Sequence, residues 1–223
     1  AFFVDPVCVD EMTEVAHYTG FAEFRRLCQF HALNQKAVAK RFAKEQGKKY
    51  EELNLIVCHM GGGVSIGAHM KGSVVDTQNA LDGEGPFSPE RSGSLPTGQL
   101  VKQCFSGKYT EGEMHRMLSG RGGLVAYTGS NDMRYLLAEA KNDKKIAGVV
   151  DAFHYQIGKE IGAMAAVMHG KVDQIILTGG IAHSRYVADY LTKKVRFIAP
   201  VEVMAGEFEL EALAAGASRV LSG

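Results

Sequence analysis

The sequence predicts a mixed α/β fold in which buried strands end at glycine turns. Two apolar runs support this prediction: 53–66, which is interrupted by three consecutive glycines, and 172–177, which is followed by Gly179-Gly180. Two long amphipathic patterns, 21–46 and 146–169, are typical of helices that cover a sheet. Doubly wound and actin-like architectures both place ligands at such strand ends.

Composition sets broad limits on function. The 223 residues are 46% hydrophobic and 22% charged, and 25 basic side chains balance 25 acidic ones. A net charge of zero favours neither nucleic acid nor an acidic membrane surface as a partner. No apolar run approaches the ~18 residues of a membrane span, and we expect none. Four widely spaced cysteines without zinc spacing indicate reduced thiols in a cytoplasmic protein.

The elements follow from the pattern in chain order. Ala1–Val4 looks like a buried strand, and because the chain starts there with alanine we expect it to be part of a longer protein. A short helix within 10–20 and the helix 21–46, closed by Gly47, precede strands joined by short turns. A long loop rich in glycine and proline spans 77–98, and long ordered loops are often functional. Further helices are expected at 98–105, 110–119, 133–140, 146–169, 184–193 and 207–221, with strands at 172–177 and 195–198.

The three glycines Gly61, Gly62 and Gly63 follow a strand that stops at His59. A bare backbone lets a ligand come close, and exposed N–H groups suit an anion such as phosphate. The alternative is a flexible β-turn, which is the usual meaning of a glycine cluster. The second glycine turn, Thr178-Gly179-Gly180, precedes a helix and would bring a helix N-terminus against an anion or a nucleotide.

Taken together, these segments resemble the acetate/butyrate kinase family, and its butyrate branch in particular. Residues 79–93, from Asn79 to Gly93, form the longest match. The resemblance implies an actin-like ATPase fold with a ribonuclease H-like mixed sheet flanked by helices. It implies that 1–20 end an N-terminal domain and that 21–223 form a C-terminal nucleotide-binding domain. The first phosphate element of the family, N-x-G-S-x-S-x-K, is not found in this sequence. The matching stretches are 30–36, 59–63, 79–93, 129–134, 178–181 and 207–211.

The resemblance also implies a reaction: reversible transfer of the γ-phosphoryl group of ATP to a short-chain carboxylate such as butyrate. A carboxylate is already an anion at neutral pH, so the nucleophile needs no general base. The difficulty lies in aligning two anions and in stabilising the transferring group, for which cations, hydrogen-bond donors and Mg²⁺ are suited.

Three residues match catalytic positions of the family. Arg91, in an R-S-G motif within the long loop, would be the cation at the transition state; otherwise it would be a surface arginine in a salt bridge. His31 would contact the phosphoryl group, although a histidine among apolar residues is more often a core residue. Asp5 would organise the metal and the attacking group, or else would only be a turn residue before Pro6. Acetate kinases have a second histidine where this chain has Gln35.

Other residues match the sites for the nucleotide and for Mg²⁺. Glu209 matches an acidic residue near the magnesium site, with Glu207 and Glu211 close by; its alternative role is a favourable charge in the first turn of a helix. Asp132 could cap the helix that follows, a role that can coexist with nucleotide binding, and Gly179-Gly180 could instead serve close strand–helix packing. The positions matching the ATP/ADP site are His59, Gly61, Gly62, Gly63, Asp132, Met133, Arg134, Gly180, Ile181 and Ser184.

Two other functions remain compatible with the pattern. One is a non-catalytic actin-like module that holds ATP, and the other is a domain for self-association, since the family forms homodimers through this half. Arg91 and His31 distinguish the kinase from the ATP-holding module, because a module that only binds a nucleotide needs neither residue.

Overall fold

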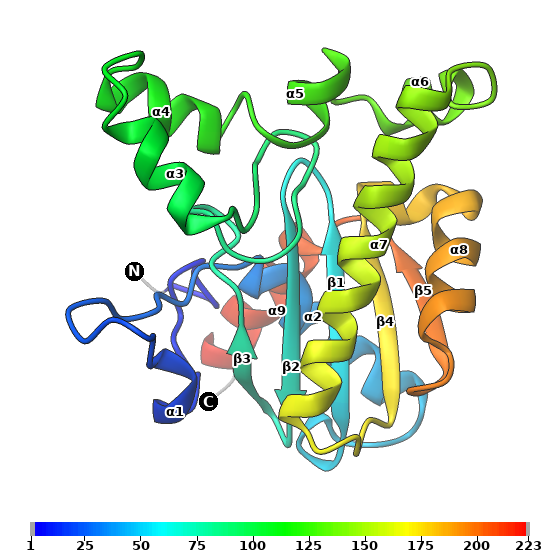
Figure 1. The fold of residues 1–223 in the computed structure, drawn as a ribbon. Helices are drawn as coiled ribbons and strands as arrows, with labels where there is room; N and C mark the ends of the chain where they lie inside the picture. Colours follow the sequence, from blue (N-terminus) through cyan, green and yellow to red (C-terminus); the bar gives the residue numbers. More distant parts are fainter. Residues whose placement is uncertain (1–2, 222–223) are drawn as a thin grey trace.

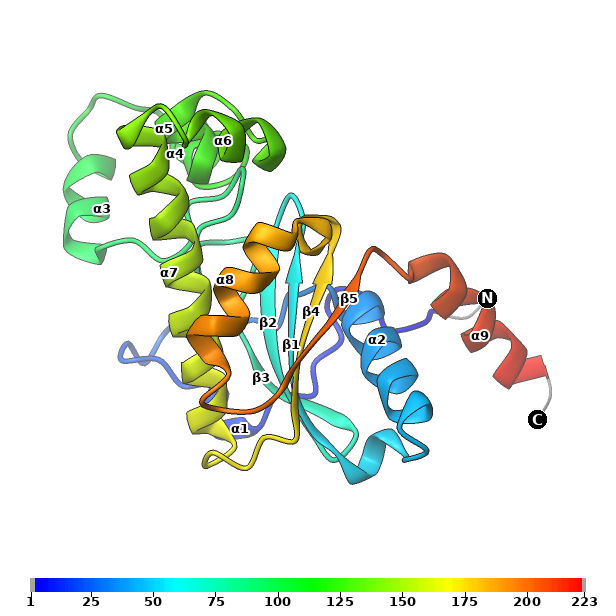
Figure 2. The same cartoon turned by 90° about the vertical axis from the view of Figure 1, so that its right-hand side faces the viewer.

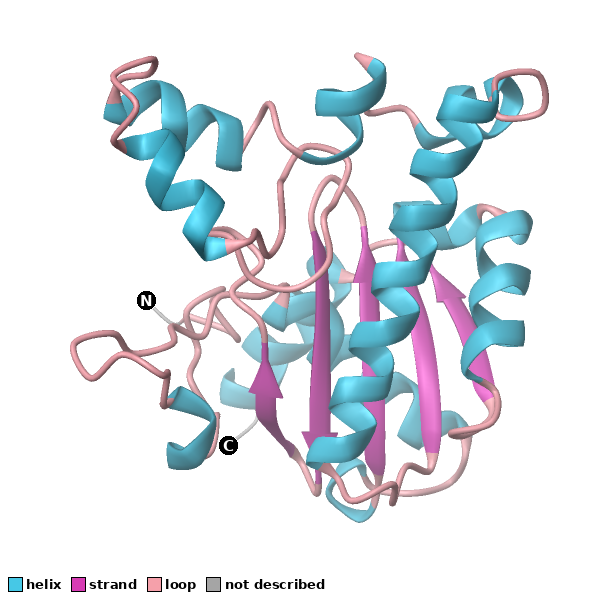
Figure 3. Ribbon diagram, viewed as in Figure 1, coloured by secondary structure: helices cyan, strands magenta, loops and turns pink. Residues whose placement is uncertain are grey.

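A computed structural model describes residues 3–221 as a five-stranded sheet covered by helices on both faces (Figures 1 and 3). The strand order is β3-β2-β1-β4-β5. β1, β4 and β5 run parallel, whereas β2 pairs antiparallel with both β1 and β3. This confirms the predicted ribonuclease H-like mixed sheet. The strands are β1 (Asn54–Met60), β2 (Val64–Met70), β3 (Ser73–Thr77), β4 (Gln174–Gly179) and β5 (Val201–Ala205).

The helices form two layers and a cap. α7 and α8 lie on one face of the sheet, and α2 and α9 lie on the other (Figure 2). α3 to α6 gather beyond the end of the sheet at which β1 and β4 finish (Figure 1). The helices are α1 (Glu14–His17), α2 (Ala32–Glu45), α3 (Thr97–Cys104), α4 (Glu111–Leu118), α5 (Gly123–Thr128), α6 (Met133–Glu139), α7 (Lys144–Val167), α8 (Arg185–Val195) and α9 (Glu209–Leu221), with the 3₁₀ turns η1 (Tyr50–Glu52) and η2 (Gly180–His183).

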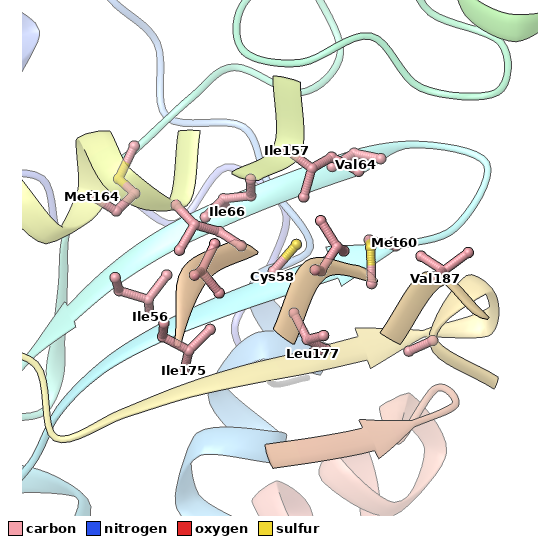
Figure 4. Close-up of a cluster of buried hydrophobic side chains, with 14 of the residues drawn as sticks. Ile56, Cys58, Met60, Val64, Ile66, Ile157, Met164, Ile175, Leu177 and Val187 are labelled. Carbon is pink, nitrogen blue, oxygen red and sulfur yellow. The ribbon is translucent and has the colours of Figure 1, made fainter. Parts of the chain in front are cut away.

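β1 is apolar from Leu55 to Cys58 because both of its faces are covered. Ile56, Cys58 and Met60 point toward α7 and α8 (Figure 4), and Leu55 and Val57 pack with residues of α2. Complete burial of a large aliphatic side chain contributes about 1.5–3 kcal/mol to stability. The core of the domain therefore fixes the ends of β1 and β4, where the glycine turns lie.

Gly179 ends β4 at a point of close approach to β1. Its φ is 86°, and a Cβ at this position would collide with the backbone of Met60. A glycine is therefore required here for conformation and for space. The diglycine was expected to serve close strand–helix packing, but the close approach at Gly179 is to strand β1, and a Cβ on Gly180 would meet open space.

The predicted helix 21–46 is wrong over residues 21–31, because α2 begins only at Ala32. Phe21, Phe24 and Leu27 are exposed, although their spacing suggested a buried helical stripe. Arg26 accounts for the difference: its guanidinium donates to the carbonyls of residues 16 and 77 and to the carboxylates of residues 76 and 84. These contacts hold the segment as a loop against β3.

Two predicted strands are also wrong. Val195 ends α8, where it continues an apolar stripe with Leu191 and Val187, and the strand is Val201–Ala205 instead of 195–198. At the start of the chain, residues 1 and 2 lie outside the described residues, Val4 is not in a strand, and Phe3 is 91% exposed. Within 10–20 only Glu14–His17 is helical, and α5 was not predicted. The remaining helices lie within a few residues of their predicted ranges.

All four cysteines are free thiols, as predicted, with Cys28 and Cys58 buried and Cys8 and Cys104 exposed. Among the described residues, no helix combines the length and apolarity that a membrane crossing would need.

His154 on α7 is fully buried, and neither ring nitrogen has a hydrogen-bond partner. It packs against Phe153, Tyr186 and Tyr190, while Asp151 on the same helix is the nearest charge that affects it. Burial lowers its pKa to about 4. Leaving a polar group buried without a partner costs about 1–3 kcal/mol.

We predict that His154→Leu stabilises the domain, and increasingly so at acidic pH. The unfolded chain binds a proton at this histidine near pH 6.5, whereas the folded chain does so only near pH 4. As the pH falls from 6.5 to about 4, the folded domain therefore loses stability relative to the unfolded chain, by about 3 kcal/mol in total. Urea unfolding at pH 7, 5.5 and 4 measures this, with His115→Gln at an exposed position as the control. An equal pH dependence in wild type and His154→Leu would contradict the prediction.

Candidate functional site

The turn Gly61–Gly63 joins β1 to β2, which pair directly at Met60 and Val64. The N–H of Gly61 donates to the carbonyl of Gly63 at 2.8 Å, and Ser88 Oγ donates to the carbonyl of Gly62 at 2.9 Å. None of the three glycines has a positive φ. Space and not an unusual backbone conformation explains Gly63 and, less tightly, Gly61, whereas a Cβ on Gly62 would meet open space.

Arg91 occupies the space that Gly63 leaves open. A Cβ on Gly63 would collide with the Arg91 guanidinium and would lie 3.3 Å from Cε1 of His31. The guanidinium donates to the carbonyl of Ala80 at 3.1 Å, and the backbone N–H of Arg91 donates to Ser88 Oγ at 3.1 Å. The long loop thus brings Arg91 to the glycine turn, and its pKa is lowered by burial.

His31 and His59 stack on each other beside this turn, with ring centroids 3.8 Å apart and an interplanar angle of 12°. His31 is the N-cap residue of α2, not a residue within the helix as predicted. Its Nδ1 lies 2.7 Å from Ser65 Oγ on β2. His59 lies near the end of β1, where its Nδ1 is 2.8 Å from Nδ2 of Asn34.

Both stacked rings are neutral at physiological pH. Burial, and secondarily the charge of Arg91, lowers the pKa of His31 to about 4. Burial, and secondarily His31, lowers that of His59 to about 3. One guanidinium and two neutral imidazoles therefore surround a strip of bare backbone. This set of donors suits an anion with several oxygens, such as a phosphoryl group.

The acidic residues predicted for the metal make different contacts, although Asp5 and Glu211 line one cavity of about 420 Å³. Asp5, with a φ of 40°, pairs with Lys36 at 3.2 Å and with Lys40 at 3.7 Å on the outer side of α2. Glu209 is exposed in the first turn of α9. Glu207 comes nearest to the glycine turn, with Oε1 3.8 Å from the Cβ position of Gly61. Among the described residues, no three His, Cys, Asp or Glu side chains form a metal-binding group.

The first group of predicted nucleoside residues lies at the start of α6. Asp132 caps the helix, its carboxylate accepting from the backbone N–H of Arg134 at 2.9 Å. Met133 is buried in the main core, and the side chain of Arg134 is 92% exposed. The structural roles of Asp132 and Met133 are therefore clear, while a role in nucleotide binding stays a prediction.

The second group lies between β4 and α8. Gly180 opens η2, Ile181 is half-buried against the main core, and Ser184 caps α8 by accepting from the N–H of Val187 at 3.5 Å. A cavity of about 600 Å³ lies between α6, α7 and α8, and Arg134 and Tyr186 are among the residues that line it. Of the predicted nucleoside residues, only Arg134 lines this cavity.

A second cavity, of about 860 Å³, lies between α3, α4, α5 and α7. Its lining includes the apolar residues Leu100, Met114 and Val149. Ser92 and Gly122 also line it, so it adjoins the loop that holds Arg91, but Arg91 itself does not line it.

Three polar residues of the site, Asn34, Ser65 and Ser88, were not predicted as functional, and Glu207 was named only as a neighbour of Glu209. The first three are buried, and each donates to or accepts from a residue of the glycine turn or one of the stacked histidines. The position of Asn34 three residues after His31 on α2 is the available sequence signal, since this spacing returns to the same side of a helix.

The model of the acetokinase family matches residues 16–206. The chain belongs to the acetokinase family. It is 56% identical over 226 residues to butyrate kinase 2 of Clostridium acetobutylicum, covering 100% of this chain and 63% of that protein. It is 51% identical over 224 residues to a probable butyrate kinase of Bacteroides thetaiotaomicron, covering 100% of this chain and 64% of that protein. The chain thus spans less than two thirds of the length of these relatives.

Solved structures agree with the fold. The crystal structure of Porphyromonas gingivalis acetate kinase matches with a TM-score of 0.82 and 21% identity, covering 92% of this chain and 60% of that one. A propionate kinase from Francisella tularensis matches with a TM-score of 0.79 and 22% identity, covering 90% of this chain and 59% of that one. Together with the strand order, this confirms the predicted actin-like ATPase fold.

We predict that Gly63→Ala displaces the Arg91 guanidinium from the turn. The new Cβ takes the space of the guanidinium, whereas a Cβ on Gly62 meets open space and makes Gly62→Ala the matched control. Modification of Arg91 by phenylglyoxal, mapped by mass spectrometry, should become several-fold faster in Gly63→Ala and unchanged in Gly62→Ala. Equal reactivity in wild type and both variants would show that the glycine does not make room for Arg91.

Proposed function

We propose that the protein containing this chain transfers a phosphoryl group reversibly between ATP and a short-chain carboxylate, with butyrate as the first candidate. The convergence of Arg91, His31 and His59 on the bare turn Gly61–Gly63 carries the proposal. The names of the most similar relatives support the substrate class. A module that only held a nucleotide would have no need for a half-buried guanidinium beside the phosphate turn.

The chemistry follows from charge. The attacking carboxylate is already ionised, so the site has to bring two anions together and stabilise the transferring group. Arg91 supplies a positive charge that is half-buried, and a charge acts more strongly where water is partly excluded. His31 and His59 supply neutral donors, and the N–H groups of the glycine turn can hold the phosphate oxygens of the nucleotide.

The described residues offer little of their own to hold Mg²⁺. This ion is usually held by one or two carboxylates, with phosphate oxygens and water completing its shell. Glu207 beside the glycine turn fits such a partial site, and Glu209, two residues on, remains a candidate. Mg²⁺ held there would supply positive charge that offsets part of the negative charge of the nucleotide phosphates. No contact of Asp5 in the structure supports its predicted role at the metal.

The remaining parts of the proposal concern domain organisation, location and assembly. We propose that 21–223 form the nucleotide-binding domain, and that the nucleoside lies along Asp132–Arg134 and Gly180–Ser184. A cytoplasmic location, which rests on the cysteine pattern, and a homodimer or higher homo-oligomer, which rests on the family, remain predictions.

We predict that Arg91→Ala lowers kcat by ~10³-fold or more in the longest natural form of the protein, since an arginine at a phosphoryl-transfer transition state contributes on this scale. The Kd for ADP should change little. The assay traps the acyl phosphate with hydroxylamine over acetate, propionate, butyrate, isobutyrate and isovalerate. Arg116→Ala, at an exposed position on α4, is the control. Near-normal turnover in Arg91→Ala would refute the role of Arg91, and no hydroxamate from any acid in wild type would refute the function.

We further predict that residues 1–223 alone bind ADP weakly and turn over far more slowly than the longest natural form. The physical reason is that these residues supply the glycine turn but not the N-x-G-S-x-S-x-K element. Calorimetric titration with ADP and Mg²⁺ measures the affinity. Adenosine, which lacks the phosphates, is the control ligand and should bind more weakly still. Robust acyl phosphate formation by residues 1–223 would contradict this prediction.

A further inference from the structure

A continuous chain of hydrogen bonds runs behind His31 into the core. Tyr50 Oη lies 2.7 Å from His69 Nδ1, and His69 Nε2 lies 3.0 Å from Gln35 Oε1. Gln35 Nε2 lies 2.8 Å from Ser65 Oγ, which lies 2.7 Å from His31 Nδ1. Tyr50 is 4% exposed, and the side chains between it and His31 are fully buried. Water therefore cannot substitute for a missing partner in this chain.

The direction of each bond is determined by one backbone group. Gln35 Nε2 is also 3.1 Å from the carbonyl oxygen of Ser65, which can only accept. The amide nitrogen must therefore face Ser65, and the amide oxygen must face His69. His69 consequently donates from Nε2 and accepts at Nδ1 from the Tyr50 hydroxyl.

The same reasoning settles the tautomer of His31. Ser65 Oγ already accepts from Gln35 Nε2 and, at 3.3 Å, from the backbone N–H of His31. A hydroxyl oxygen has two lone pairs, so the remaining role of Ser65 is to donate its own proton. Nδ1 of His31 accepts that proton. The neutral ring must therefore carry its hydrogen on Nε2, the nitrogen that is left for a ligand.

An independent contact determines the tautomer of His59 in the same way. The backbone N–H of Phe208 donates to Asn34 Oδ1 at 2.9 Å, which leaves Nδ2 of Asn34 as the donor. Nδ2 faces Thr178 Oγ1 at 3.4 Å and His59 Nδ1 at 2.8 Å. His59 therefore also accepts at Nδ1 and carries its hydrogen on Nε2. That nitrogen lies 3.2 Å from the Cβ position of Gly61, on the side of the glycine turn.

We propose that Ser65, backed by Gln35, and Asn34 are positioning residues that hold His31 and His59 as neutral Nε2–H donors toward the glycine turn. The proposal deepens the proposed function, because it assigns these two donors to the oxygens of the transferring phosphoryl group. Gly67 belongs to the same arrangement, since a Cβ there would lie 2.6 Å from Gln35 Oε1.

The two histidines would then act by hydrogen bonding and not by proton transfer. A neutral Nε2–H can approach a phosphate oxygen while leaving the positive charge to Arg91. The surroundings agree with neutral rings: burial and then Arg91 on the long loop disfavour protonation of His31, and burial and then His31 disfavour protonation of His59 on β1. Serine donation to Nδ1 has the same effect, because a protonated ring has no lone pair there.

The test is nuclear magnetic resonance of residues 1–223 with ¹⁵N-labelled histidine, which reports tautomer and pKa without any turnover. His31→Gln and His59→Gln assign the two signals. In the wild type, both rings should be Nε2–H tautomers at pH 7. Ser65→Ala should convert His31 to a mixture of tautomers and raise its pKa by about one unit, the equivalent of one hydrogen bond. It should leave the tautomer of His59 unchanged.

Two isosteric variants test separately the hydrogen bonds behind His31 and the hydrogen bond to His59. Asn34→Asp keeps the acceptor for Phe208 but removes the donor to His59, so His59 alone should move its hydrogen to Nδ1. Gln35→Glu keeps the acceptor for His69 but removes the donor to Ser65, so Ser65 should donate to the new carboxylate and His31 should change to Nδ1–H. This second variant also tests the proposal if Ser65→Ala does not fold.

An Nδ1–H tautomer of either ring in the wild type, or unchanged His31 signals in both Ser65→Ala and Gln35→Glu, would overturn the proposal. Failure of the proposed function would appear differently, as an absence of hydroxamate with the tautomers as described. In the longest natural form, Ser65→Ala should lower kcat several-fold more than it raises the KM for ATP. A purely structural role of Ser65 would instead lower thermal stability with the His31 tautomer and pKa intact.

Discussion

The parallel pairing of β1 with β4 is the constraint on which the site depends. In this register His59 lies directly beside Thr178, so the ends of the two strands meet at one edge of the sheet. Gly179 makes the close approach possible, because no side chain fits between it and the backbone of Met60. Asn34 on α2 then contacts both register partners, His59 and Thr178, with a single amide nitrogen. The position of α2, and with it that of His31, follows from this pairing.

The parts of the fold that the sequence predicted well are those determined by local chemistry. β1 and β4 are apolar runs that stop at glycines, and Asp132 and Ser184 are capping residues directly before a helix. The segment 21–31 failed because its conformation is decided by Arg26, whose four partners come from residues up to 58 positions away. Helical spacing of Phe24 and Leu27 could not reveal those contacts.

The same difference between local chemistry and long-range contacts separates the residues of the site. Arg91, His31 and His59 could be named from their motifs, since each lies in a stretch that matches the family. Ser65 lies outside those stretches, and Asn34 lies within one without a motif that assigns it a role. Glu207 could be named only as a neighbour of Glu209, because its importance comes from the turn that the fold brings to it. Ser65 alternates with apolar residues along β2 and is indistinguishable in the sequence from any small residue in a strand. The same limit applies to the metal, since Glu207 and Glu209 differ in their position relative to the turn and not in type.

Burial explains why the site is built from neutral histidines and one arginine. Imidazoles held between α2, β1 and β2 would lose hydration if protonated, and the lowered pKa values of His31, His59 and His69 reflect this cost. A guanidinium keeps its charge under the same conditions because its pKa starts far higher, and Arg91 is only half-buried. Neutral rings in turn need defined partners, since a buried nitrogen without one is costly, as His154 illustrates on the opposite face of the sheet. The buried hydrogen bonds behind His31 and His59 therefore meet a requirement of the core, and in doing so they leave both Nε2–H groups at the surface of the glycine turn.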